Sequence, residues 1–159
     1  MNYALPTLLM LSLSMNACGQ KISDTAVPQP VRAAFQKQFP SAEKVKWEME
    51  DKTKYEAVFN QSGTESSASY GANGNWLETE TAVKEAALPA AVRATLASKY
   101  PGHKLSAFER LETPEGTMYE VEAEKGEHTV EVKLAADGKV LKVAEVEEEK
   151  GEGDVEEKD

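Results

Sequence analysis

A duplication inside the chain is the feature that most constrains its fold. The stretch LPAAVRATLASKYP, from Leu88 to Pro101, has a near-copy 61 residues earlier, VPQPVRAAFQKQFP, from Val27 to Pro40. The correspondence continues beyond these stretches: Trp47-Glu48 matches Phe108-Glu109, and Tyr55-Glu56 matches Tyr119-Glu120. Between these two matches the second copy has three additional residues. Self-similarity of this kind indicates one structural unit built twice. The sequence therefore predicts two units of about sixty residues each.

Each unit is expected to open with a short helix. In the first unit Val31, Phe35 and Phe39 are spaced as one face of a helix, and Val92, Leu96 and Tyr100 repeat this spacing in the second. A proline near the start of each stretch is compatible with the first helical turn. Phe39 and Tyr100 each precede a proline, which disfavours helical backbone at the preceding residue. Both helices are therefore predicted to end there.

After each helix the apolar period changes to two, which is typical of strands with one packed and one solvated face. Val45, Trp47 and Met49 alternate with polar residues, and Asn73-Gly74 and Asp137-Gly138 are strong hairpin signals. We predict an α+β fold of two tandem repeats, each a helix followed by a four-stranded antiparallel meander. A unit of this size is marginal alone. Two units packed together, or two sheets that run on as one, would give a sufficient core.

The first residues resemble a bacterial lipoprotein signal. An apolar run from about Leu5 to Met15 is too short to span a bilayer and fits the core of a signal peptide. It is followed by Ala17 and by Cys18, the only cysteine in the chain. We expect a signal peptide over residues 1–17, lipidation at Cys18 and a linker over 18–26. Plain secretion with a free thiol is the alternative, because no Lys or Arg precedes the apolar run.

The last residues are strongly acidic. From Glu145 to Asp159 there are nine acidic residues and two lysines, which accounts for most of the net charge of −10. Such a block is typical of a disordered tail, and we assign it to residues 148–159, after repeats over 27–81 and 82–147. The rest of the chain is only slightly acidic. This balance argues against nucleic acid as a partner, because phosphate binding relies on many basic groups.

The sequence contains no recognisable catalytic constellation. His103 and His128 have no counterparts in the other unit and do not have the spacing of a metal site. Phosphate-binding and zinc-protease motifs are missing from the sequence, so we expect no enzyme, no catalytic residue, no metal and no cofactor. Arg32 and Arg93 recur at one helix position. They are interpreted either as surface ion pairs with Glu48 and Glu109 or as an anion site.

The aromatic residues are concentrated in the first unit. Most of them are expected in the core, where the helix must pack. Trp47, Tyr70 and Trp76 are nevertheless candidates for partner binding, because Tyr70 and Trp76 flank the Asn73-Gly74 hairpin and the second unit lacks them. Trp and Tyr dominate the binding energy of many protein interfaces. An aromatic patch on one unit alone is what a function added to a duplicated scaffold would produce.

Together, the helix motif P-x-x-V-R-A ending in Phe/Tyr-Pro, the strand KVKWE and the lipoprotein-like start resemble the PepSY-like, beta-lactamase-inhibitor-like proteins. The resemblance extends over about residues 25–147. It implies a tandem fold similar to beta-lactamase inhibitor protein, but an inhibitory activity does not follow from a fold. The repeats also lack the disulfides of the secreted inhibitors.

These observations favour a non-enzymatic module on the periplasmic side of a bacterial envelope membrane, anchored through Cys18. It would bind, and could inhibit, an envelope protein or peptide. The alternative is a periplasmic small-ligand or Ca²⁺-type cation binding protein that uses surface carboxylates.

Overall fold

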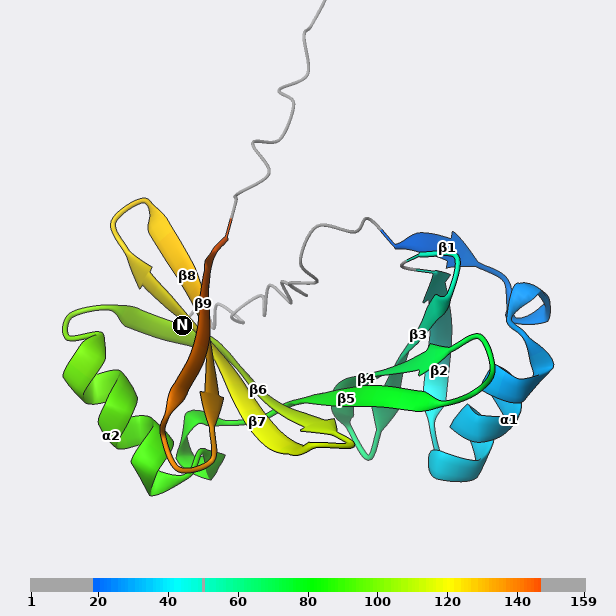
Figure 1. Cartoon of the computed structure of the whole chain (residues 1–159), viewed down its shortest axis with the longest axis horizontal. Coiled ribbons are helices and arrows are strands. Elements are labelled where there is room, and N and C mark those ends of the chain that lie inside the picture. The colour runs from blue at the N-terminus through cyan, green and yellow to red at the C-terminus, as the bar shows by residue number, and fades with distance from the viewer. Residues whose placement is uncertain (1–18, 50, 147–159) are drawn as a thin grey trace, which may run out of the picture.

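The computed structural model describes residues 19–49 and 51–146, which form one nine-stranded antiparallel sheet with two short helices (Figure 1). The strands are hydrogen-bonded in sequence order from β1 to β9. In the first half the elements are β1 (Gln20–Ile22), the 3-10 helix η1 (Asp24–Ala26), α1 (Gln29–Gln38), β2 (Glu43–Met49), β3 (Lys54–Gln61), β4 (Thr64–Gly71) and β5 (Trp76–Ala82). In the second half they are the 3-10 helix η2 (Glu85–Ala87), α2 (Ala90–Lys99), β6 (Lys104–Thr113), β7 (Gly116–Lys125), β8 (His128–Ala135) and β9 (Val140–Glu145).

The predicted fold class, an α+β pair of repeats each with its own four-stranded meander, is wrong. The strands do not close into two sheets, because β5 pairs with β6 from Thr79↔Glu112 to Ala82↔Glu109 and joins the two halves. An additional strand, β1, precedes α1 and pairs with β2. The described chain is therefore mostly β and forms a single continuous sheet. Of the two ways in which the repeats were expected to share a core, this is the one in which two sheets run on as one.

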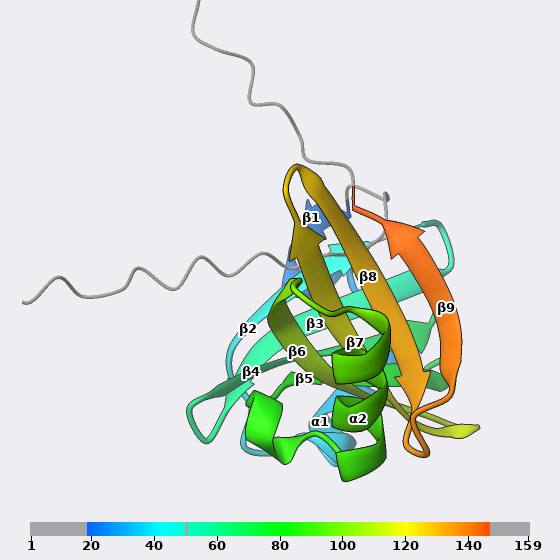
Figure 2. The same ribbon diagram turned by 90° about the vertical axis from the view of Figure 1, so that its left-hand side faces the viewer.

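Both helices lie on the same side of the sheet and outside its curve, α1 on the first half and α2 on the second (Figures 1 and 2). In the first half, Val31 and Phe35 of α1 pack on Trp47, Phe59 and Tyr70. The corresponding α2 residues, Val92 and Leu96, pack on Val121, Val132 and Leu134. The sheet thus has two separate hydrophobic cores on one face.

The predicted helix ends and hairpins are present. Phe39 and Tyr100 are the C-caps of α1 and α2, one residue before a proline in each case. The Asn73-Gly74 and Asp137-Gly138 pairs form the turns between β4 and β5 and between β8 and β9. Each turn is closed in the same way, since the Asn73 or Asp137 side chain accepts a hydrogen bond from the backbone N–H two residues later.

Both of these hairpin turns contact the start of a helix. A Cβ atom on Gly74 would lie 2.7 Å from the Pro30 carbonyl oxygen of α1, and one on Gly138 would lie 2.5 Å from the Ala91 carbonyl oxygen of α2. Both glycines also have a φ of +85°, which other residues rarely adopt. Glycine at these positions therefore allows each helix to lie directly against its own hairpin.

None of the described helices is long and apolar enough to cross a membrane. The two predictions that concern the chain ends, lipidation at Cys18 and the acidic tail over 148–159, fall outside the described residues.

Candidate functional site: a carboxylate-lined sheet face

Glutamates from strands of both halves line the sheet face that is turned away from the helices. Side chains alternate along a strand, so the residues between those packed under α1 and α2 point to the opposite face. The strand register places these glutamates in rows that cross neighbouring strands on this face. We call them the carboxylate face: Glu48, Glu56, Glu78, Glu80, Glu109, Glu120, Glu122 and Glu131.

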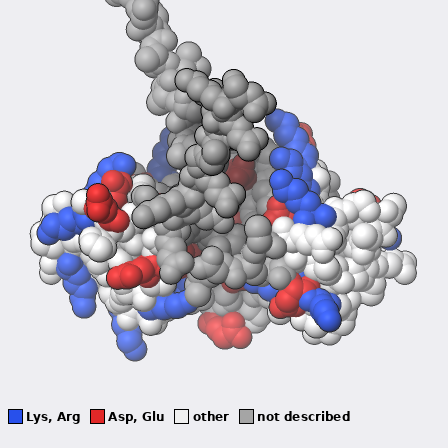
Figure 3. Space-filling view, turned by 90° about the horizontal axis from the view of Figure 1, so that it is seen from above, with Lys and Arg blue, Asp and Glu red and all other residues white. Residues whose placement is uncertain are grey.

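The two halves of this face meet where β5 pairs with β6. Glu80 on β5 lies opposite Leu111, and Glu109 on β6 lies opposite Ala82. The two glutamates are therefore diagonal neighbours on adjacent strands, within reach of long side chains. In the view from above, acidic and basic side chains are interspersed over the visible described surface of both halves (Figure 3). The junction therefore brings together carboxylates that are 29 positions apart in the sequence.

The carboxylates at the junction are harder to ionise than a free glutamate. Burial, and then the neighbouring carboxylates of Glu109, Glu78 and Glu56, raise the pKa of Glu80 to about 8. Burial, and then Glu131, Glu122, Glu56 and Glu65, raise the pKa of Glu109 to about 7. Desolvation and like charges both disfavour the ionised form of a carboxyl group. At neutral pH the junction is thus held between its protonated and ionised states.

Several other glutamates of the face are nearly buried. Glu56, Glu120, Glu122 and Glu131 are each no more than 8% exposed. Glu120 forms an ion pair with Lys133, and Glu78 accepts from Lys54 Nζ at 2.9 Å. Glu122 differs, because its Oε2 accepts only a long bond from Ser106 Oγ (3.3 Å) and its Oε1 is buried without a partner. A buried, unpaired carboxylate oxygen is costly, and a functional role is one physical reason for a protein to retain it.

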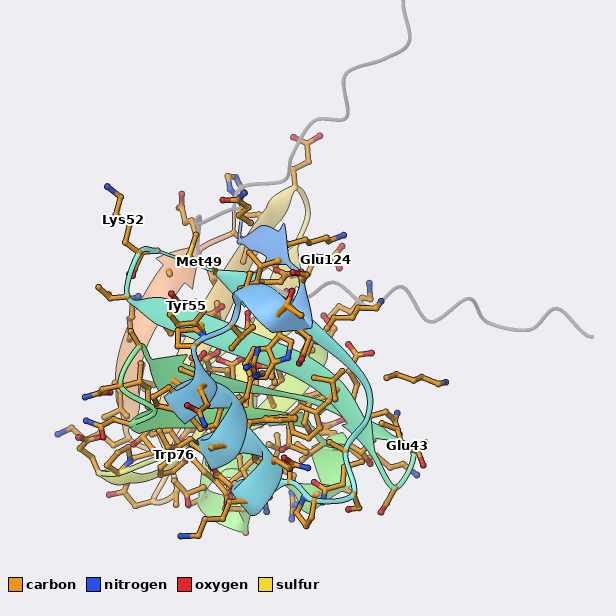
Figure 4. All side chains as sticks on the ribbon, turned by 90° about the vertical axis from the view of Figure 1, so that its right-hand side faces the viewer. Glu43, Met49, Lys52, Tyr55, Trp76 and Glu124 are labelled. Atoms are coloured by element: carbon orange, nitrogen blue, oxygen red, sulfur yellow. The ribbon has the colours of Figure 1, made fainter. Side chains whose placement is uncertain are left out.

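Of the three aromatic candidates, Trp47 and Tyr70 lie in the first core. Trp47 is 5% exposed and Tyr70 is not exposed, and both contact the Phe35 ring edge-on. Trp76 is partly buried and lies beside α1 (Figure 4), where its indole N–H donates to Thr79 Oγ1 at 2.9 Å. Only Trp76 therefore has surface that a partner could contact in this structure, and its binding role stays a prediction.

The repeated arginines hold the 3-10 helices against α1 and α2. Arg32 Nη1 donates to the Asp24 carbonyl oxygen at 2.6 Å, and Arg93 Nη1 donates to the Ala86 and Leu88 carbonyl oxygens. Neither arginine is paired with Glu48 or Glu109 within the part of the chain that the structure describes, because those carboxylates point to the other side of the sheet. Their recurrence in both halves has a structural reason.

The two histidines lie in turns or at a strand end. His103 packs edge-on against the Tyr100 ring at 5.4 Å, and His128 is the exposed first residue of β8. Within residues 19–49 and 51–146, no three His, Cys, Asp or Glu side chains are grouped as a metal ion would require.

Sequence reasoning missed the carboxylate face, because alternating glutamates on strands were interpreted as solvated residues. A signal was available, since Glu48 corresponds to Glu109, and Glu56 corresponds to Glu120, in the internal alignment. The burial of Glu56 and Glu120 and the partial burial of Glu109 were not predictable, because they depend on the way the strands of the two halves join.

Within the described residues, the fold is a curved antiparallel sheet with both helices on one face and polar side chains on the other. A fold of this kind does not by itself determine an activity. Residues 14–67 and 53–142 match the family described as "Putative beta-lactamase-inhibitor-like, PepSY-like". These ranges include most of the chain, which therefore belongs to this family, as the sequence motifs predicted. None of the curated proteins matches the chain.

Solved structures of similar proteins support this assignment. A BLIP-like protein from Bacteroides fragilis is 31% identical with a TM-score of 0.66, over 75% of this chain and 86% of that chain. A protein from Bacteroides eggerthii, described among "putative periplasmic proteins", has a TM-score of 0.70 at 21% identity, over 75% of this chain and 88% of that chain. The second similarity shows the fold alone. The family description refers to inhibitor-like proteins and mentions no catalytic activity.

Proposed function

We propose that this protein is a non-enzymatic module of the bacterial envelope whose carboxylate face binds a lysine- or arginine-rich segment of another protein. The observation that carries the proposal is the meeting of the half-buried Glu80 and Glu109, one from each half, at the β5–β6 junction, with the buried Glu122 Oε1 left without a partner. A cationic side chain entering this face would supply the donor that Glu122 Oε1 lacks. Charge-assisted hydrogen bonds of this kind are among the stronger polar contacts in proteins.

The arrangement of the helices supports this choice of face. Because α1 and α2 both cover the opposite side, the carboxylate face is free of helical cover among the described residues. The lysines on it, such as Lys54 and Lys133, are already engaged with Glu78 and Glu120. Complementary charge on the partner would then determine which proteins bind and how quickly they associate.

An exported, membrane-anchored location fits the same proposal. The signal-like residues 1–17 and Cys18 support it, as does the periplasmic description of the similar protein from Bacteroides eggerthii. β1 begins at Gln20, two residues after Cys18. Two residues span at most about 7 Å, so a lipid on Cys18 would hold the β1 edge of the sheet directly at the membrane surface.

The proposal can be tested with two synthetic peptides of equal length, one rich in lysine and arginine and one rich in glutamate. Binding would be measured by fluorescence anisotropy with the mature chain at pH 6 and pH 8. We expect only the basic peptide to bind. Its affinity should be higher at pH 8, because Glu80 and Glu109 ionise over this range.

A matched pair of variants separates the site from the overall negative charge. Glu80→Gln/Glu109→Gln and Glu85→Gln/Glu115→Gln each replace two carboxyl groups, but Glu85 and Glu115 are exposed in η2 and in the turn between β6 and β7. The first variant should weaken binding about tenfold or more and remove its pH dependence. Equal weakening by both variants would mean unspecific attraction and would overturn the proposal.

A further inference from the structure

A second site lies on the helix side of the sheet, in the space that the two helices leave uncovered. A hollow of about 360 Å³ is bounded by the end of α1, the turn between β3 and β4, and strands β4, β5 and β6. Most of the residues that line it are polar, among them Ser66, Thr79, Thr81, Arg110 and Glu112, and Phe39 lies at its edge. This hollow is separated from the carboxylate face by the thickness of the sheet.

Strand register explains why these side chains converge. Ser66 on β4 lies opposite Thr81 on β5, and Thr81 lies opposite Arg110 on β6, so the three form one cross-strand row. Thr79 and Glu112 form the next row. Since paired residues on neighbouring strands share a sheet face, both rows point into the hollow. The hollow exists only at the junction, because each helix covers the same face within its own half.

The hydroxyl groups in the hollow are only partly used by the protein. Ser66 Oγ and Thr81 Oγ1 are 3.4 Å apart, a long contact, and Thr79 Oγ1 already accepts from the Trp76 indole. Ser66 and Thr79 are nearly buried, at 8% and 4% exposed. A rotatable hydroxyl can both donate and accept, so this lining suits a ligand that carries hydroxyl groups.

Arg110 provides the charge in the hollow. Its Nε is buried and has no hydrogen-bond partner, and its Nη2 is 3.7 Å from Glu112 Oε1, beyond hydrogen-bond distance. The Nε–H and one Nη–H of a guanidinium form a planar fork that fits the two oxygens of a carboxylate. Glu112 would repel a doubly charged phosphate more strongly than a singly charged carboxylate. The guanidinium and its neighbour therefore favour a monoanion.

From these contacts we infer that the hollow is a binding site for a small hydroxylated carboxylate, held by the Arg110 fork and by the hydroxyls of Ser66 and Thr81. Phe39 at the rim would contact the apolar part of such a ligand. This site is independent of the carboxylate face, takes a ligand of opposite charge and does not rest on the proposed function.

The probe for this inference is glucuronate, with glucose as the neutral analogue of similar size. Binding would be followed by ¹H–¹⁵N NMR of the mature chain, in which the Trp76 indole N–H is a direct reporter because it donates to Thr79 of the lining. We expect glucuronate at roughly millimolar concentration to shift this resonance and the amides of residues 61–66, 79–81 and 110–112. Glucose should shift them much less.

Two variants complete the test. Arg110→Gln should weaken glucuronate binding about tenfold or more, because it removes the charged fork. Lys104→Gln, on the same strand but facing the other side, is the matched control and should leave binding unchanged. No shift with glucuronate, equal shifts with glucose, or binding that survives Arg110→Gln in a folded protein would each overturn the inference.

Discussion

At the scale of single residues, Glu80 and Glu109 contribute strongly to the dependence of stability on pH. Their pKa values in the folded protein, about 8 and about 7, lie above the ordinary glutamate value of 4.5. Between these values the folded state binds more protons than the unfolded state, so stability falls as pH rises. We expect the free energy of unfolding to decrease from pH 5 to pH 8.5. Urea denaturation at several pH values measures this directly.

Replacement of Glu80 identifies the source of this dependence. Glu80→Gln keeps the shape but cannot ionise, so it should raise the free energy of unfolding at pH 8 by about 1–2 kcal/mol and have little effect at pH 5. Glu115→Gln, in the exposed turn between β6 and β7, is the control and should change neither value. A stability that is independent of pH between 5 and 8.5 would contradict this account of the junction.

Tyr70 is a core residue whose hydroxyl has one specific role. It donates to Gln38 Oε1 of α1 at 2.9 Å, while the ring is fully buried against Phe35. Tyr70→Phe should lower the free energy of unfolding by about 1 kcal/mol, and Tyr70→Ala by about 3–5 kcal/mol. Thermal or urea unfolding measures both. If Tyr70→Ala left stability unchanged, the placement of this ring in the core would be wrong.

At the scale of elements, the contact between each helix and its hairpin depends on glycine. Gly138 has a φ of +85°, and an added Cβ would lie 2.5 Å from the Ala91 carbonyl oxygen and 2.7 Å from Thr95 Oγ1. Gly138→Ala should therefore lower the free energy of unfolding by about 2–4 kcal/mol, through backbone strain and displacement of α2. Chemical denaturation followed by far-UV circular dichroism measures the loss.

Gly126 provides the matched control for this prediction. Its φ is also positive, at +65°, but a Cβ there would meet nothing within 4 Å. Gly126→Ala should cost about 1 kcal/mol from backbone strain alone. Equal effects of the two substitutions would show that the contact between hairpin and helix contributes nothing.

The elements themselves were largely predictable, because their signals are local. Helix ends before Pro40 and Pro101, and turns at Asn73-Gly74 and Asp137-Gly138, follow from backbone restrictions of a few residues. The partner of an outer strand is not a local property. Alternation predicts which residues share a face, but it does not distinguish a meander that ends at β5 from one that continues into β6.

The same limit explains what was missed at the candidate sites. Glu80 and Glu109 belong to different halves, as do Thr81 and Arg110, and only the β5–β6 pairing brings them together. Trp47 and Tyr70 were singled out for their chemistry, whereas their burial follows from α1 lying across that face. Residue type alone did not separate core aromatics from an exposed patch.

At the scale of the whole molecule, the question is whether the two cores unfold as one. They share no buried residue, but β5 and β6 are paired over four positions, and the unpaired edge of either half would expose backbone groups. We therefore expect a single cooperative transition. The chain contains a convenient reporter, because both tryptophans, Trp47 and Trp76, lie in the first half.

A substitution in the second core would test this coupling from a distance. Leu96 is 1% exposed, and Leu96→Ala should lower the free energy of unfolding by about 2–5 kcal/mol. If the sheet transmits this loss, tryptophan fluorescence from the first half and far-UV circular dichroism from the whole chain will shift to the same lower urea midpoint. An unchanged fluorescence midpoint, with a two-step dichroism curve, would mean that the halves unfold independently. In that case the carboxylates at the junction would be held together by pairing too weak to preserve a binding face.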